Sequence, residues 1–176
     1  IQMVNSAIQS VKHLVSRLRP AILNDLGLAA AMEWYLEDFG KRTGIDCEAR
    51  IDSGAAGSQA LDNERCISIF RIFQEALTNV ARHAEATELF VSLRKQDEGI
   101  VFLLTDNGRG IDAEHINTNE SFGLIGIRER VNSLGGEMAI SGRCGKGTTL
   151  KVALPLSETG GGCGSLVSTP DASRDV

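Results

Sequence analysis

The chain has 176 residues, of which 42% are hydrophobic and 23% charged, and its formal net charge is -5 at pH 7. This length allows one domain with an appendage or two small domains. The acidic balance argues against nucleic acid as a main partner, because contact with phosphates needs a basic face. No apolar run reaches the roughly 18 to 20 residues of a membrane helix, so we expect no direct membrane contact of this segment.

The four cysteines form no C-x-x-C pattern and have no neighbouring histidine pair. This spacing disfavours a disulfide framework or a zinc site. A reducing compartment fits such cysteines best, and we therefore expect a cytoplasmic location. Whether a longer parent protein is anchored in a membrane is left open.

Residues 1–19 have the pattern of an amphipathic helix. Their apolar residues are spaced alternately by three and four positions: Ile1, Val4, Ile8, Val11, Val15 and Leu18. This spacing is typical of a coiled coil or a four-helix bundle, although packing on its own domain is the alternative. Pro20 predicts the end of this helix. We therefore expect a bundle helix at 1–20, a folded domain at 21–156 and a disordered, glycine-rich tail at 157–176.

Residues 21–156 show helix and strand patterns in the order helix, strand, helix, two strands, helix, two strands. Helices are expected at 25–43 with Asp25 as the N-cap, at 62–84 and at 122–134. Strands are expected at 45–51, 89–95, 100–105, 137–141 and 149–154. The stretches 52–60 and 112–121 are predicted to be loops. Because most strands come in adjacent pairs, an α+β fold is favoured over a Rossmann domain, with a mixed or antiparallel sheet and helices on one face.

The helix expected at 62–84 has one apolar and one polar face. At about 100° per residue, the polar face gathers a carboxylate, an amide, a guanidinium and an imidazole: Glu75, Asn79, Arg82 and His83. A solvated helix face would look the same, so this helix alone does not indicate a site. Asn79 is a candidate ligand for Mg²⁺, which takes oxygen ligands.

Three glycine-bearing segments follow this helix in order: Asp106-Asn107-Gly108-Arg109-Gly110, Gly123-Leu124-Ile125-Gly126 and Gly145-Lys146-Gly147-Thr148-Thr149. Glycines let a backbone turn tightly and approach a ligand closely. Asp106 ends a strand, where its carboxylate can accept a hydrogen bond from the exocyclic amine of adenine. Gly123 and Gly126 flank a helix N-terminus, whose free N–H groups can bind phosphate. Each segment alone could be an ordinary turn, but together they predict a nucleotide pocket.

The ordered set resembles the ATP-binding domain shared by gyrase, the heat-shock chaperone of that fold, mismatch-repair ATPases and sensor histidine kinases. The segments that resemble its N, G1, G2 and final glycine boxes are 70–84, 106–110, 123–126 and 145–148. The resemblance covers about residues 45–156. It implies a two-layer α/β sandwich of the Bergerat type, with a mostly antiparallel sheet, that binds ATP and Mg²⁺.

Further segments are similar to the nitrate-sensor-like histidine kinases: Leu18-Arg19-Pro20, Leu26-Gly27-Leu28, Gly123 to Arg130 and Leu134-Gly135-Gly136. This resemblance implies that residues 1–20 are the C-terminal helix of a dimerisation and phosphoacceptor bundle. The full protein would be a homodimer that transfers the γ-phosphate of ATP to a histidine, for relay to the receiver domain of a response regulator. Two alternatives stay open: another kinase or ATPase of the superfamily, such as an anti-sigma-type serine kinase, and a non-catalytic dimerisation module.

The resemblance also implies roles for single residues. Asp106 would bind the adenine amine, and Gly108, Gly110 and Ile111 would close the base pocket. Asn79 would hold Mg²⁺. Glu75 is a second possible Mg²⁺ ligand and matches the water-activating carboxylate of hydrolysing relatives. Asn79 and Glu75 are therefore the expected catalytic residues. The remaining nucleotide-binding candidates would lie near the phosphates and a lid at 112–121: Arg82, His83, Gly123, Leu124, Gly126, Gly147 and Thr148.

No histidine of this sequence matches the phosphoacceptor of that subfamily. Its acceptor precedes an acidic residue, whereas the three histidines here precede Leu14, Ala84 and Ile116. His13 lies off the apolar seam and is expected at the surface. We therefore expect the acceptor to lie outside this fragment.

Overall fold

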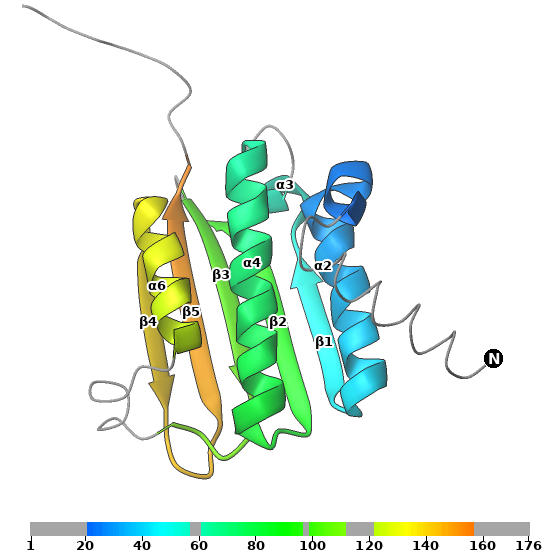
Figure 1. Cartoon of the computed structure of the whole chain (residues 1–176), viewed down its shortest axis with the longest axis vertical. Coiled ribbons are helices and arrows are strands. Elements are labelled where there is room, and N and C mark those ends of the chain that lie inside the picture. The colour runs from blue at the N-terminus through cyan, green and yellow to red at the C-terminus, as the bar shows by residue number, and fades with distance from the viewer. Residues whose placement is uncertain (1–20, 57–60, 97–98, 112–121, 157–176) are drawn as a thin grey trace, which may run out of the picture.

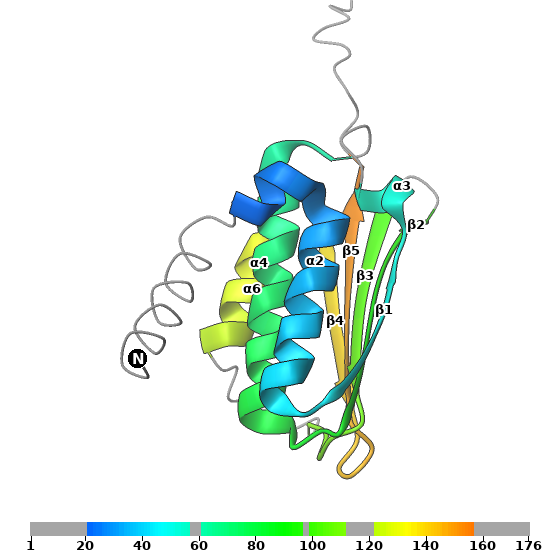
Figure 2. The ribbon, with the colours of Figure 1, turned by 90° about the vertical axis from the view of Figure 1, so that its right-hand side faces the viewer.

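The computed structural model describes residues 21–56, 61–96, 99–111 and 122–156. They form two layers, with a sheet on one side and the long helices packed on one of its faces (Figures 1 and 2). The expected bundle helix, the lid and the tail lie outside the described residues. Among the described residues, no helix combines the length and the apolar composition that crossing a bilayer requires.

The first described helix begins earlier than the sequence predicts. Helix α2 spans Ala21–Thr43 and is interrupted by a kink at Gly27, with φ 80° and ψ 174°. Positive φ is a conformation that glycine adopts without strain. Asp25 therefore lies inside α2, and its predicted role as the N-cap is wrong. The sequence prediction missed the helical residues before Gly27, because a glycine near a helix start normally indicates a helix end or a turn.

The expected loop at 52–60 is helical at its start. Helix α3, Ser53–Ala56, buries Ala55 and Ala56. The Asp52 carboxylate accepts a hydrogen bond from the Gly54 N–H at 2.8 Å and so satisfies a free donor of this turn. The glycine- and alanine-rich composition of this stretch predicted a loop, but Ala55 and Ala56 are buried in the core.

Helix α4, Asn63–Asn79, carries the polar face of the candidate site. Asp62 caps it by accepting from the Arg65 N–H at 2.7 Å. Beyond Asn79 the helix continues as a π-helix, η1, over Val80–Ala84, and Glu85 ends it with φ 54° in the left-handed region. The sequence predicts one continuous helix here, and the change of helix type is a finding of the structure. Single π turns often occur at functional sites.

The sheet has the strand order β1-β2-β3-β5-β4. Its strands are β1 (Asp46–Ile51), β2 (Glu88–Gln96), β3 (Gly99–Asp106), β4 (Glu137–Gly142) and β5 (Thr148–Pro155). Only β1 and β2 pair in parallel, and the other pairs are antiparallel. The remaining helix, α6 (Phe122–Ser133), covers β4 and β5 (Figure 1). The predicted mixed, mostly antiparallel sheet with helices on one face is confirmed.

The core lies between the helices and the inner face of the sheet. Phe73 of α4 is fully buried and makes an edge-on contact with Phe102 of β3, with ring centroids 6.4 Å apart. Tyr35 of α2 makes a similar contact with Phe70 of α4, at 5.7 Å. Burying one such ring stabilises the fold by about 1.5–3 kcal/mol. This packing fixes the rotation of α4 about its axis. The polar face of α4 therefore turns toward α6, the C-terminal end of β3 and the N-terminal start of β5.

Candidate nucleotide-binding site

A cavity of about 240 Å³ opens between the end of α4, η1, the start of α6 and the ends of β3 and β5. Seven of its lining residues are among those predicted for the nucleotide: Asn79, His83, Asp106, Gly110, Ile111, Leu124 and Thr148. Most of its remaining wall is apolar: Ala76, Val80, Ala84, Leu104, Ile140 and Leu150. A mostly apolar hollow with a few polar groups is typical of small-molecule sites.

Asp106 is the buried carboxylate of this cavity. It ends β3 and is only 5% exposed. Its Oδ1 accepts hydrogen bonds from the Gly108 N–H at 2.9 Å and the Thr148 N–H at 3.3 Å. Burial raises the pKa of the Asp106 carboxyl, and these two N–H donors offset part of that effect. The side chain is thus fixed through one oxygen, in a place where a charge is costly.

The loop after Asp106 packs so closely against other backbone segments that its glycines leave no room for a side chain. A Cβ atom at Gly108 would overlap the carbonyl group of Ala84, and one at Gly147 would overlap that of Asp106. Gly147 also has φ 79°, which disfavours other residues. Backbone hydrogen bonds join the same segments, from Arg109 N–H to the Ala84 carbonyl at 2.7 Å and from Gly147 N–H to the Gly108 carbonyl at 2.8 Å. Gly108 and Gly147 therefore support the cavity from behind and are not among its lining residues.

Asn107 ties this loop to the start of β2. Its Oδ1 accepts from the N–H groups of Thr87 and Glu88, both at 2.9 Å, and its Nδ2 donates to Thr87 Oγ1 at 2.9 Å. The Asn107 side chain thus takes the place of a backbone hydrogen-bond partner at the start of β2, where the pairing with β3 ends. Sequence reasoning treated Asn107 only as a turn residue. The bias of asparagine toward side-chain-to-backbone bonds is a signal, but it does not identify the partner.

Two polar side chains of α4 converge on the first turn of α6. A Cβ atom at Gly123 would overlap Oε1 of Glu75 and lie 3.0 Å from Oδ1 of Asn79. Among the described residues, the buried Nδ2 of Asn79 has no hydrogen-bond partner. Glu75 is not a lining residue of the cavity, but its carboxylate lies at the Asn79 end of it.

This end has the donor chemistry that Mg²⁺ prefers. Asn79 and Glu75 offer an amide and a carboxylate oxygen one helical turn apart, and Mg²⁺ commonly adds water and substrate phosphates to one or two such ligands. The described residues contain no group of three or more His, Cys, Asp or Glu side chains that could hold a metal. The amide and carboxylate oxygens of Asn79 and Glu75 fit the small protein share of ligands that Mg²⁺ takes when waters and phosphates complete its shell.

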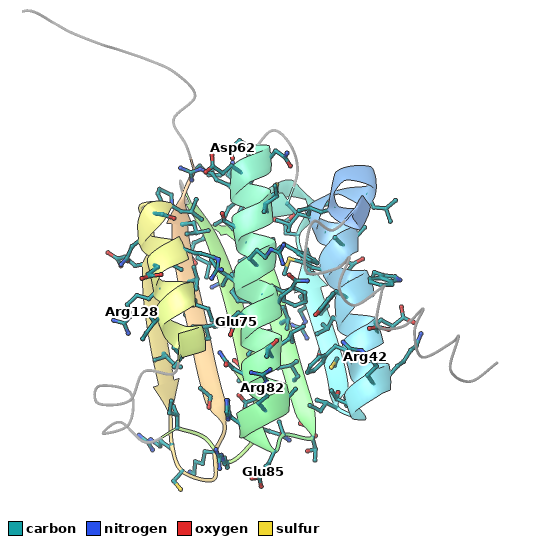
Figure 3. The ribbon with its side chains drawn as sticks, viewed as in Figure 1. Arg42, Asp62, Glu75, Arg82, Glu85 and Arg128 are labelled. Atoms are coloured by element: carbon teal, nitrogen blue, oxygen red, sulfur yellow. The ribbon has the colours of Figure 1, made fainter. Side chains whose placement is uncertain are left out.

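The other predicted residues lie around the cavity at different depths. His83 of η1 lines the cavity, whereas Arg82 is exposed at the lower end of the helix and is not a lining residue (Figure 3). Gly126 faces its own helix, since its carbonyl accepts from Arg130 Nη1 at 2.8 Å. Arg109 lines the cavity and was not among the predicted residues. Its place between two glycines of a turn gave no signal for it.

The chain is similar to known proteins over most of its described length. A family model described as histidine kinase-, DNA gyrase B-, and HSP90-like ATPase matches residues 65–158. The signal transduction histidine-protein kinase/phosphatase DegS of Brevibacillus brevis is 33% identical over 157 residues, which cover 89% of this chain and 39% of that protein. UhpB of Salmonella typhimurium, described in the same words, is 37% identical over 151 residues, which cover 83% of this chain and 28% of that protein.

A solved structure shares the fold. The histidine kinase domain of the blue-light activated histidine kinase EL346 from Erythrobacter litoralis has a TM-score of 0.61 and 25% identity, covering 74% of this chain and 61% of that one. The chain spans less than two fifths of the length of the DegS and UhpB relatives. These relatives confirm the predicted kinship with sensor histidine kinases. With the matched family model, they show that the chain belongs to the histidine kinase-, DNA gyrase B- and HSP90-like ATPases.

Proposed function

We propose that this domain binds ATP with the base against Asp106 and the phosphates toward Asn79 and the first turn of α6. The observation that carries the proposal is the buried carboxylate in this mostly apolar cavity, fixed through Oδ1 by two backbone N–H groups. Because those donors use Oδ1, the second oxygen is left to accept from the amine of adenine. A base with a carbonyl at that position would place acceptor against acceptor, which selects adenine.

The opposite end of the cavity would hold the phosphates and the metal. Asn79 would offer Oδ1 to Mg²⁺ and its unpartnered Nδ2 to a phosphate oxygen. A bound Mg²⁺ would neutralise part of the phosphate charge. His83 lines the same cavity and Arg82 precedes it in η1, so either could approach the phosphates. Gly123 and Gly126 would leave the first turn of α6 open to them.

For the whole protein we infer the activity of a sensor histidine kinase. The relatives are described as histidine kinases, and the family binds ATP. The γ-phosphate would pass to a histidine on a dimerisation bundle and from there to a response regulator, in a homodimer on the cytoplasmic side where ATP is available. Positioning and charge neutralisation supply most of the catalysis of phosphoryl transfer. In this domain, the positioning would come from Asp106 at one end of the nucleotide and from Asn79 at the other.

Calorimetric titration of the Mg²⁺ complex of a non-hydrolysable ATP analogue tests the binding mode. We expect saturable binding that Asp106→Asn weakens about tenfold or more. Asparagine would keep its oxygen on the two backbone donors and turn its NH₂ group toward the amine of adenine, donor against donor. Asp46→Asn removes an exposed carboxylate of β1 and serves as the matched control. Equal affinity in all three proteins, or no binding at all, would contradict the proposal.

A further inference from the structure

Glu75 has an environment unlike that of Glu64, the other carboxylate of α4. It lies between α4 and α6 (Figure 3), half-buried, with Oε1 against the backbone of Gly123. Glu64, in the first turn of the same helix, is exposed. None of the ion pairs formed among the described residues includes Glu75. Among the residues that the structure describes, no cation therefore forms an ion pair with the Glu75 carboxylate at the start of α6.

The same turn of α6 is where the proposed binding mode places the phosphates. Asn79 Oδ1 and Glu75 Oε1 meet at Gly123, so a phosphate near Asn79 also lies near the Glu75 carboxylate. Two like charges a few ångströms apart repel strongly where water is partly excluded, and less where they are fully solvated. A metal-free triphosphate carries several negative charges. A carboxylate at this place would therefore oppose the binding of phosphates that no metal has neutralised.

We propose that Glu75 makes nucleotide binding at this site dependent on Mg²⁺, by repelling the phosphates of metal-free ATP. The inference rests on the proposed function, because it needs the phosphates at the α6 end of the cavity. It differs from a role as a metal ligand. A ligand contributes only when the metal is present, whereas a repelling charge acts most strongly when the metal is absent.

The test compares the Kd of ATP measured in EDTA with the Kd measured in excess Mg²⁺. In Glu75→Gln, which keeps the shape and removes the charge, we expect metal-free ATP to bind about tenfold more tightly than in the wild type. The ratio of the two Kd values should fall accordingly. Glu75→Asp keeps the charge and should retain most of the wild-type ratio.

Two controls separate charge at this place from charge in general. Glu64→Gln removes the same charge from the same helix, about 16 Å away along its axis. This distance exceeds the Debye length of about 8 Å at physiological ionic strength, so the ratio should not change. Adenosine has no phosphates, and its Kd should be the same in the wild type and in Glu75→Gln.

The outcomes distinguish this inference from the proposed function. If Glu75→Gln weakens Mg²⁺-ATP and leaves metal-free ATP unchanged, Glu75 is a metal ligand and the inference is wrong. If the ratio does not change while adenosine and ATP still bind, the inference is wrong and the binding mode survives. If neither adenosine nor ATP binds the wild type, the proposed function itself fails.

Discussion

The two ends of the cavity differ in whether backbone or side-chain atoms close them. Around Asp106, glycines press against backbone carbonyl groups: Gly108 against Ala84, Gly110 against Arg143 and Gly147 against Asp106. At the start of α6, Gly123 instead meets the side-chain oxygens of Glu75 and Asn79, and Gly126 meets only the end of the Arg130 side chain. One end is therefore closed by the main chain and the other by side chains.

This difference determines how each end can respond to a ligand. Backbone segments joined by hydrogen bonds move only together, so the base end is formed before a nucleotide arrives. A side chain can change rotamer, or leave its preferred rotamer by about 30° at a cost of about 0.5–1.5 kcal/mol. We therefore expect the adenine pocket to be rigid and the phosphate end to adjust to its ligand and metal.

The largest effect is expected for a side chain added at the rigid end. Gly147→Ala would force a Cβ into the Asp106 carbonyl at a position with φ 79°, and no side-chain rotation relieves it. We expect a loss of about 3 kcal/mol or more in the free energy of unfolding, with loss of adenosine binding. Urea denaturation and calorimetry measure the two quantities.

Gly145→Ala is the matched control for that variant. Gly145 lies in the same turn with φ 73°, but a Cβ there would meet nothing within 4 Å. Only the cost of the left-handed backbone applies, about 1–2 kcal/mol. If Gly145→Ala and Gly147→Ala destabilise the protein equally, the close backbone contact of Gly147 does not matter and the comparison of the two ends fails.

A smaller effect is expected at the adjustable end. Gly123→Ala would displace the side chains of Glu75 and Asn79 but leave Asp106 untouched. We expect the Kd of Mg²⁺-ATP to rise about fivefold to tenfold, an effect of about 1 kcal/mol that rotamer changes can supply. The Kd of adenosine should stay within about twofold. A loss of adenosine binding in Gly123→Ala would show that the two ends are not independent. Gly126→Ala controls for the loss of a glycine in the same turn.

Sequence reasoning reaches the adjustable end through local signals and the rigid end only in part. Glu75, Asn79 and Gly123 follow from helical periodicity and from a glycine at a helix start, which are local signals. The contact of Gly147 with Asp106 joins residues far apart in the chain, and no local rule gives it. The sequence-based expectation that Gly147 and Thr148 lie near the phosphates and lid stays a prediction. In the structure Gly147 lies against the Asp106 carbonyl group, and the Thr148 N–H donates to the Asp106 carboxylate.

The helix that carries the site shows the same limit. Its apolar stripe predicted the burial of Phe70, Phe73 and Leu77 because tertiary packing needs one continuous face. The π turn at Val80–Ala84 has no such pattern. It coincides with the hydrogen bond from Arg109 N–H to the Ala84 carbonyl, a contact with the next loop. A change of helix type that depends on a contact with a distant segment cannot be predicted from the local sequence.

The pH dependence of stability can sharpen the account of the rigid end. Burial raises the pKa of Asp106 from the usual 3.8, so the folded protein holds this proton at a pH where the unfolded chain has lost it. The stabilisation from protonated Asp106 is therefore present at low pH and is lost as the pH rises through the raised pKa. We expect wild type to lose stability relative to Asp106→Asn as the pH rises from about 4 toward 7. A constant difference over that range, measured by urea denaturation, would contradict the burial effect.

The smallest effect is expected at Glu85, which is strained but stands beside the rigid end without closing it. Its φ of 54° lies in the left-handed region, where a Cβ costs about 1–2 kcal/mol. Its only ion pair among the described residues, with Arg109 at 3.9 Å, is exposed and contributes little. Glu85→Gly should relieve the strain but add freedom to the unfolded chain, for a net gain of about 0.5 kcal/mol. Urea denaturation at matched m-values measures this gain, and adenosine binding should not change. If Glu85→Gly instead weakens adenosine binding, the turn after η1 needs its strained residue to hold the loop of Asp106, and the rigid end extends further along the chain than its glycines indicate.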